Sequence, residues 1–538
     1  NVAVGFDALG DQSNAGHVDV YNTAVGYEAG KAVTTGVQNT IIGGLAGLSL
    51  TTGSFNQAIG YNALASEDAS NRNTAIGYFS LASQNINGDG NNVAVGHSSG
   101  QNVTTGSSNV ILGASCGFSL TTGDSNVAVG FDTLGDETTG GNNVAVGRSA
   151  MSSSQLSKHN VAIGTQALQN VTNSTLKNTY NVGVGSFAGM DITTGERNIL
   201  IGGFAGDDMT TGEDNIGIGY NAIGGITTGD SNIAIGFEAG NSLTSGNNQV
   251  LIGHETGESL TTGERNVAIG HNALKTEDEH GRNVAVGYQA LKILNAGADA
   301  FNTAVGYDSG LNITTGVQNT LIGGRAGDAL TTGIENVSLG YLALSAEDAE
   351  SYNTAIGTGA LKVQDGGASN TAVGREAGKS ITTGDNNTIV GANAGDALTT
   401  GSNNTIIGKN AAASAVGVNN EITLGDSNIS AIRAQVTSIS SLSDRRDKKD
   451  IEDSVYGLEF LESLKPVTFE WDQRDGNRVG VKDIGFIAQD LQEVDDEYTR
   501  LVYESNPDKL EATYGRLIPV LVKAIQDLSE EVKQLKNK

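Results

Sequence analysis

The feature that most constrains this chain is a short internal repeat. A unit of about 17 residues recurs 24 times between Asn1 and Asn404. Each unit begins with asparagine, except one that begins with Gln249, and continues with two variable residues, an aliphatic residue and glycine. Such a unit is too short to bury a hydrophobic face alone, but it suffices for short strands and turns that stack on identical neighbours. We therefore expect residues 1–419 to form an all-β, parallel β-solenoid (β-roll) shaft.

The residue types within each unit predict strand, corner and core positions. The fourth residue is always Val, Ile or Leu, and the second is Val, Thr, Ile or once Gln, so a period of two places both on one face of a strand. The fifth residue is glycine in all 24 units, which predicts a corner with positive φ or a close backbone approach. The eighth residue is always small, so we expect an interior column in which Cys116 is an inert core residue.

Further repeated features support stacking. Many units carry an aliphatic residue followed by Thr-Thr-Gly, as at Val33–Gly36, which predicts a second short strand that turns at glycine. Stacked strands use backbone N–H groups on both sides, and all 3 prolines lie beyond residue 465. Asparagines at one corner can form a hydrogen-bonded ladder. The interval lengthens to 19 or 21 residues at four places, which predicts loops on one face, for example over residues 171–180.

Composition excludes several classes of partner. The formal net charge of −29 argues against nucleic acid and anionic membrane surfaces, because both need clustered Lys and Arg. A single cysteine excludes a disulfide framework and a multi-cysteine zinc site. No run of about 18 apolar residues exists, so we expect no membrane insertion. Because the chain opens at Asn1 in the middle of the pattern, we expect the segment that attaches the shaft to lie upstream.

The C-terminal part has a different composition. The repeat decays after Asn404 into a Ser/Thr-rich neck, expected over residues 420–442, and charged residues are dense from Ser443 onward. Alternation predicts a strand over Val467–Trp471. The tail, residues 517–538, places apolar residues at spacings of three and four, which predicts a coiled coil between chains. A helix buried within one domain would give the same pattern.

The repeats resemble the head repeats of trimeric autotransporter adhesins. Units such as Asn22–Gly30 (NTAVGYEAG) and Asn232–Gly240 (NIAIGFEAG) carry the resemblance, which covers about residues 1–419. It implies a left-handed parallel β-roll trimer, although the period is longer here. We expect no membrane-anchor barrel of the kind that those adhesins carry.

The C-terminal segment resembles the endosialidase-type intramolecular chaperones, which are also self-cleaving peptidases. Five residues match the opening motif of that family position by position: Ser443, Asp444, Arg446, Lys448 and Ile451. The stretches Ile484–Gln489 and Tyr514–Gln526 agree as well. The resemblance implies a small α+β chaperone domain, residues 443–538, that directs trimer assembly of an upstream fibre, often on bacteriophage tails. It also implies cleavage between Leu442 and Ser443, with the Ser443 hydroxyl as nucleophile and Lys448 as base.

Other candidate binding and metal-ligating residues also have purely structural explanations. Aromatic or His residues often follow the corner glycine, as at Tyr27 and His254, and this stripe could bind glycans or pack between chains or against loops. The pairs Glu67–Asp68, Glu277–Asp278 and Glu347–Asp348 could ligate calcium, but adjacent carboxylates more often solvate a loop. None of the 6 histidines has the spacing of a catalytic metal site. We therefore expect no cofactor and no metal.

These observations predict a structural homotrimeric fibre rather than an enzyme that acts on a separate substrate. A bacteriophage tail fibre, located in the virion and involved in host attachment, is the first expectation, with two identical chains and a host cell-surface glycan or protein as partners. The alternatives are a glycan-degrading tailspike, which needs paired carboxylates in a groove, and a bacterial adhesin on the cell surface or secreted. An ice-binding solenoid is disfavoured, because adjacent threonines point in opposite directions.

Overall fold

The structure is a computed structural model that describes residues 1–13, 19–433, 435, 443–474, 479–504, 508 and 510–538. The chain divides into two compact units, Asn1–Asn336 and Val337–Lys538, which are treated separately below. Most of the Ser/Thr-rich end of the expected neck, including Leu442, lies outside the described residues. None of the helices among the described residues is long and apolar enough to cross a membrane.

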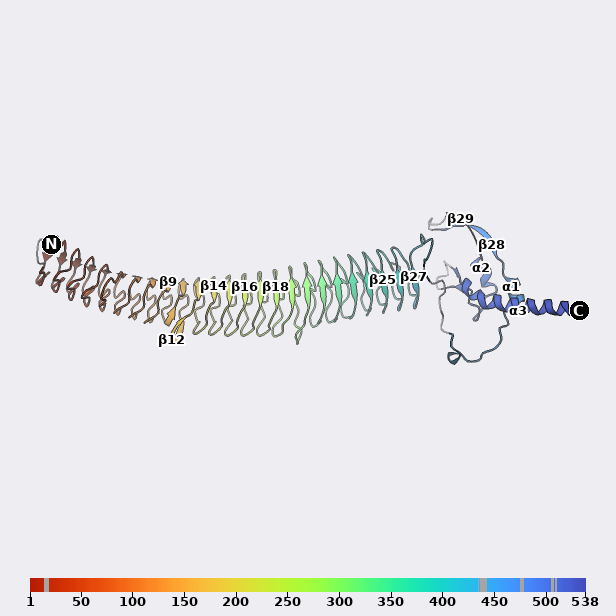
Figure 1. Cartoon of the computed structure of the whole chain (residues 1–538), viewed down its shortest axis with the longest axis horizontal. Coiled ribbons are helices and arrows are strands. Elements are labelled where there is room, and N and C mark those ends of the chain that lie inside the picture. The colour runs from red at the N-terminus through yellow and green to blue at the C-terminus, as the bar shows by residue number, and fades with distance from the viewer. Residues whose placement is uncertain (14–18, 434, 436–442, 475–478, 505–507, 509) are drawn as a thin grey trace. The chain divides into compact units, whose positions relative to one another are not determined.

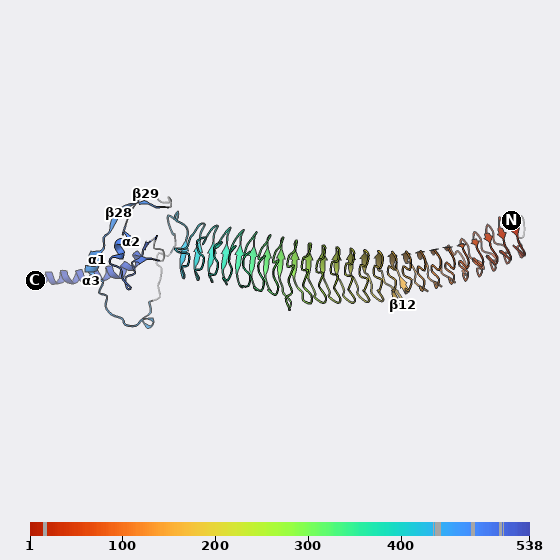
Figure 2. The ribbon, with the colours of Figure 1, turned by 180° about the vertical axis from the view of Figure 1, so that it is seen from behind.

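Unit 1 is a parallel β-solenoid with one three-residue strand in each turn, as the row of arrows in Figures 1 and 2 shows. Each strand pairs in parallel with the next along the ladder, in constant register, so that Ile233 opposes Val250, for example. The ladder strands are β1 (Val2–Val4), β2 (Thr23–Val25), β3 (Thr40–Ile42), β4 (Gln57–Ile59), β5 (Thr74–Ile76), β6 (Val93–Val95), β7 (Val110–Leu112), β8 (Val127–Val129), β9 (Val144–Val146), β11 (Val161–Ile163), β13 (Val182–Val184), β14 (Ile199–Ile201), β15 (Ile216–Ile218), β16 (Ile233–Ile235), β17 (Val250–Ile252), β18 (Val267–Ile269), β19 (Val284–Val286), β20 (Thr303–Val305) and β21 (Thr320–Ile322). The predicted fold class of the shaft is confirmed.

In the ladder strands of unit 1 after β1, the middle residue is buried in the core and its two neighbours face outward. In β16, Ala234 is fully buried while Ile233 and Ile235 are partly exposed. The face that carries the second and fourth residues of each repeat is therefore the outer one. The core is filled instead by the middle residues of the strands, most of them small and some as large as Leu251, and by eighth and twelfth residues such as Ala239 and Leu243.

The asparagine column forms the predicted ladder. Asn39 is buried and donates its backbone N–H to Asn22 Oδ1 at 2.8 Å, while Asn22 Nδ2 donates to Gly36 O at 2.8 Å. Each buried amide thus satisfies two backbone groups at a corner that no strand bond reaches. Gln249 preserves this role, because its Oε1 accepts from Asn266 N at 3.0 Å.

The corner glycines are required by both conformation and space. Gly202 has φ +139°, and a Cβ added there would lie 2.2 Å from the carbonyl oxygen of Gly219 in the next turn. No side chain larger than hydrogen fits without moving the backbone. The predicted interior column is also confirmed: Cys116 is fully buried, and burial raises the pKa of its thiol to about 12.

The predicted second strand at Thr-Thr-Gly is wrong. The segment Val33–Gly36 is bend and loop, and successive turns are joined there by Thr34 N donating to Thr51 O at 2.9 Å and by Thr34 Oγ1 donating to the same oxygen at 3.2 Å. Gly36 N donates to the same oxygen at 3.3 Å, so three donors converge on one carbonyl and no strand ladder forms.

The lengthened interval between Asn160 and Asn181 contains a strand, β12, where a loop was expected. β12 (Thr172–Asn178) pairs in parallel with β10 (Gln155–Lys158) through an irregular register, and both lie off the main row of strands (Figures 1 and 2). The next repeat nevertheless starts in place, because β13 pairs with β11 in the usual register.

Unit 2 begins with further turns of the same kind. Their strands are β22 (Val337–Leu339), β23 (Thr354–Ile356), β24 (Thr371–Val373), β25 (Thr388–Val390), β26 (Thr405–Ile407) and β27 (Ile422–Leu424). β27 extends the ladder into the expected neck, with Glu421 in the asparagine position: its backbone N–H donates to Asn404 Oδ1 at 2.9 Å. About 25 strands in all have this parallel arrangement.

The C-terminal region of unit 2 has small helices and antiparallel strand pairs. Its elements are η1 (Arg445–Asp447), α1 (Leu458–Ser463), β28 (Val467–Asp472), β29 (Val479–Gly485), α2 (Ala488–Gln492), β30 (Val502–Tyr503), β31 (Glu511–Ala512), η2 (Tyr514–Arg516) and α3 (Leu517–Lys536). β28 pairs with β29 and alternates between half-buried and exposed residues, as predicted. A small core gathers Leu464, Leu491, Leu501, Val502 and Leu517.

Candidate self-cleavage motif and neighbouring surfaces

Ser443 and Lys448 lie together. Lys448 Nζ is 2.6 Å from Ser443 Oγ and donates a hydrogen bond to it. The five-residue spacing brings the two side chains together because η1 turns the chain between them. A hydroxyl in contact with an amine is the arrangement in which a neutral lysine could remove the serine proton.

The turn between these residues is built by Asp444. Its carboxylate caps η1 by accepting a hydrogen bond from Arg446 N at 2.8 Å, and it also pairs with the Arg446 guanidinium at 2.6 Å. The Arg446 side chain holds the pKa of Asp444 below its usual range. Asp444 and Arg446 therefore position the turn rather than touch the serine. All residues from 443 to 450 are exposed, and so is Ile451.

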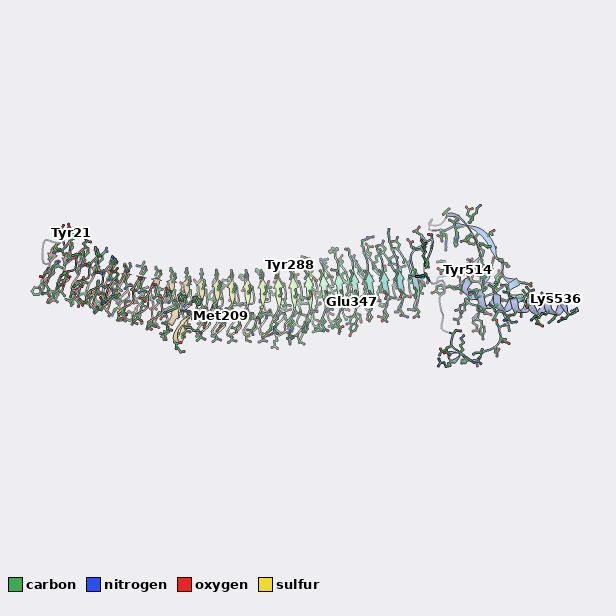
Figure 3. All side chains as sticks on the ribbon, viewed as in Figure 1. Tyr21, Met209, Tyr288, Glu347, Tyr514 and Lys536 are labelled. Atoms are coloured by element: carbon green, nitrogen blue, oxygen red, sulfur yellow. The ribbon has the colours of Figure 1, made fainter. Side chains whose placement is uncertain are left out.

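The other two family-like stretches meet each other. Tyr514, labelled in Figure 3, accepts a hydrogen bond at its hydroxyl from Phe486 N at 3.2 Å, and the two rings pack edge to face. Gly485 leaves room for this contact, because a Cβ there would lie 2.4 Å from the Tyr514 hydroxyl oxygen. These residues form the domain's framework and carry no reactive group.

Helix α3 has two apolar faces with different surroundings. Leu517, Val520 and Ala524 are buried in the small domain, and Leu458 N of α1 donates to Asp527 Oδ2 at 3.2 Å. The second face is exposed and runs at spacings of four, three, four and three through Leu521, Ile525, Leu528, Val532 and Leu535. The intradomain interpretation therefore holds for the buried face, and the coiled coil between chains stays a prediction for the exposed row.

The paired acidic loops do not behave as expected. Glu67, Glu277 and Glu347 are fully buried rather than solvating their loops. Glu67 Oε1 accepts from the backbone N–H of Asp68 at 3.0 Å and of Ser70 at 2.8 Å, so this glutamate holds the loop from inside. Burial raises the pKa of Glu277 and of Glu347.

A fourth glutamate of this kind was missed. Glu137 is equally buried and accepts from Gly140 N at 2.7 Å and Leu156 N at 3.0 Å. All four occupy the twelfth position of a repeat, where many other turns have an aliphatic core residue such as Leu243. The twelfth position in the repeat was the sequence signal from which burial of Glu137 could have been predicted. Two of these loops also bring acidic or His side chains within 4.8 Å of one another, Glu277–Asp278–His280 and Glu347–Asp348–Asp365.

The aromatic stripe packs on itself. Rings from successive turns stack face to face at centroid distances of 5.0 to 5.6 Å, with interplanar angles of 18° or less, through Tyr220, Phe237, His254, His271, Tyr288 and Tyr307 (Figure 3 labels Tyr288). The ring faces cover one another, and only the edges remain open. This stacking favours packing over glycan binding, although the partners are neighbouring turns of the same chain rather than loops.

Comparison with known proteins supports the C-terminal resemblance. A search of curated proteins found no match to the chain. Residues 443–502 match the model of the family described as chaperone of endosialidase, and the match begins at the serine of the motif. The chain therefore joins a parallel β-solenoid shaft to a C-terminal region that is similar to the chaperone of endosialidase.

Proposed function

We propose that three copies of this chain form a parallel homotrimeric fibre, that the C-terminal domain directs its folding, and that the fibre serves a bacteriophage tail in host attachment. The observation that carries the proposal is the chaperone-type segment directly after a long parallel solenoid. Chaperone domains of this type imply an upstream fibre that needs help to assemble.

The repeat itself explains why help is needed. Each ladder strand has three residues, and its partner lies one full turn away, so every pairing is non-local and slow to form. Unpaired turns expose strand edges that can join other chains. Because successive turns share one pattern, two chains shifted by a whole turn would meet nearly the same contacts. A C-terminal nucleus that joins three chains first removes this ambiguity.

Light scattering of the full chain tests the assembly. The expected mass of the Ser443→Ala chain, which should stay uncleaved, is three times the 55.1 kDa of one chain. A chain ending at residue 442 should be insoluble or of mixed mass. A full-length monomer, or a well-formed trimer from the truncated chain, would contradict the proposed chaperone role.

We further propose that the domain releases itself before Ser443. The Ser443 oxygen would attack the carbonyl carbon of residue 442; the C–N bond breaks, the nitrogen gains a proton and becomes the new amino terminus, and water then hydrolyses the ester. Lys448, whose Nζ lies 2.6 Å from Ser443 Oγ, would take the hydroxyl proton. The scissile carbonyl belongs to Leu442, outside the described residues, so the support is the Ser443–Lys448 contact and the family match.

Denaturing gels test the cleavage. The unaltered chain should give fragments of residues 1–442 and 443–538, whereas Ser443→Ala and Lys448→Ala should stay intact. Lys449→Ala is the matched control, because it removes the neighbouring exposed lysine and should still cleave. An intact unaltered chain, or cleavage of Ser443→Ala and Lys448→Ala as well, would remove the Ser–Lys pair from the mechanism.

The virion location and the host receptor belong to the same proposal. A tailspike that degrades glycans is less well supported, because its paired carboxylates need access to substrate, and four prominent glutamates are buried in backbone hydrogen bonds. An adhesin is favoured only by the repeat resemblance. Immunogold labelling of phage particles and of cells distinguishes the two locations. The release of new reducing ends from host polysaccharides would support the glycan-degrading tailspike instead.

A further inference from the structure

The outer strand face of unit 1 is an uncovered apolar surface. We use this name for the side chains of the first and third residues of the ladder strands β1–β21. These residues are Val, Ile, Leu or Thr in every strand except for Gln57. They stand partly open to solvent; Ile163 is 41% exposed, Ile199 37% and Ile201 38%. Contiguous apolar surface larger than a few hundred Å² is uncommon on monomers and marks an interaction site.

The residue pattern of the strands is that of a sheet covered on both faces. A sheet with one wet face alternates apolar and polar residues, whereas strands covered on both faces read as continuous apolar runs. β14 reads Ile-Leu-Ile and β17 Val-Leu-Ile, with the middle residue in the core and both flanking residues outside. Within one chain, the described residues cover only the inner face of this ladder.

Charge identifies the kind of partner. The chain carries −29, yet the outer strand face holds no ionisable side chain. Charged groups lie at other positions of the turn, as in the pairs of Arg197 with Glu213 and Asp214 and of Lys275 with Glu258. Two identical acidic chains repel each other wherever their charged faces meet. The neutral face is the one that a second copy can approach without this repulsion.

Spacing points to the same partner. The face repeats at every turn of the ladder in constant register, as Ile218 opposes Ile235 and Ile235 opposes Ile252. A partner surface that matches such a series over many turns needs the same rise per turn and the same side-chain pattern. A parallel, in-register copy of this chain has both.

We propose that the outer strand faces of three chains pack against one another around a common axis and form a dry aliphatic core between the chains. This inference rests on the proposed trimer and names the surface that holds it together. The polar and charged positions then form the outside of the fibre. The stacked aromatic row follows the corner glycine directly, so we place it at the rim of this core.

Disulfide trapping tests which face is inside. In a Cys116→Ala background, Ile235→Cys places a thiol on the outer strand face, and Thr228→Cys places one at an exposed position of the preceding turn, outside the strand. After oxidation at low concentration, Ile235→Cys should give covalent chain pairs on a denaturing gel and Thr228→Cys none. Pairs from Thr228→Cys alone, from both, or from neither overturn the inference.

Two further measurements separate this inference from the trimer itself. Light scattering of the same samples reports the mass: a trimer with the wrong cross-link refutes the face but leaves the trimer standing, whereas a monomer refutes both. Ile235→Lys should bring three ammonium groups together at one height and lower the melting temperature or dissociate the chains. Thr228→Lys is the matched control and should leave mass and melting unchanged; equal effects of the two would also refute the inference.

Discussion

Replacing the corner glycine Gly202 by alanine should damage the solenoid far more than replacing its neighbour Gly203. At Gly202 the added methyl meets two obstacles. The residue has φ +139°, a conformation that strains L-residues by about 1 to 3 kcal/mol. The methyl carbon would also lie 2.2 Å from Gly219 O and 2.5 Å from Gly219 C, both backbone atoms, and overpacking of this kind costs about 1 to 3 kcal/mol. We expect Gly202→Ala to lose about 2 to 6 kcal/mol.

Gly203→Ala is the matched control. There the nearest atom to an added Cβ is Tyr220 Cδ2 at 3.6 Å, an ordinary contact, so the expected change is within about 0.5 kcal/mol. Guanidinium unfolding of both variants, followed by circular dichroism, gives the comparison. Equal shifts of the midpoint, or a larger shift for Gly203→Ala, would show that the corner does not have the geometry described.

Further predictions concern buried polar groups. Asn232→Asp removes the Nδ2 donor to Gly246 O, 2.9 Å away, and places a buried carboxylate beside that oxygen; we expect a loss of about 3 kcal/mol or more, and almost none for the exposed Asn248→Asp, from the same unfolding curves. Burial, with Asp208 and Asp191 nearby, raises the pKa of Asp207 from 3.8 to about 6. The charged carboxylate therefore destabilises the folded state above pH 6. This destabilisation decreases as the pH falls and is absent below about pH 4. Asp207→Asn should therefore raise the melting temperature at pH 7.5 and leave it unchanged at pH 3.5; a gain at both would point to another cause. Glu137→Leu gives the twelfth position an aliphatic residue but leaves Gly140 N and Leu156 N without their acceptor. Limited proteolysis should therefore cleave this loop first. An unchanged cleavage pattern would contradict the role of Glu137 in holding the loop.

The period of the sequence predicted the features that every turn shares. The strand, the corner glycine and the asparagine ladder follow from residue types that recur at fixed places, because a stacked coil repeats its backbone geometry. The period did not predict which side of the strand is inside. In β16 the larger residues, Ile233 and Ile235, face outward and the smaller Ala234 faces inward. Hydrophobicity alone would have chosen the opposite orientation.

The reason is the limited space inside a narrow coil. Leu251 and Leu260, which come from a strand centre and a twelfth position, already fill the interior of their turn, and the eighth residue, Thr256, stays small. The strand centre is small in most turns and large in others, as from Ala234 to Leu251 to Ala268. The pattern that all units share does not say which turns carry the large residue.

The candidate site was predictable only through resemblance. A serine and a lysine five residues apart have no periodic relation, and their contact depends on the short turn that Asp444 caps. The prediction that the acidic pairs solvate their loops was wrong for the opposite reason. It rested on the acidic neighbours of Glu67 and Glu277 in sequence, whereas the position of these residues in the repeat decides their burial.

The irregular turns bear on how three chains would find their register. The strand pair β10–β12 and the buried glutamates lie outside the ladder strands, so they leave the outer strand face unchanged from turn to turn. A face with the same aliphatic pattern at every turn favours packing but cannot distinguish one turn from the next. If that face joins the chains, register must come from elsewhere, and the exposed row on α3, from Leu521 to Leu535, occurs once in the chain and lies outside the repeat, so it can set the register. We therefore expect substitutions in that row to produce misaligned fibres rather than unfolded shafts.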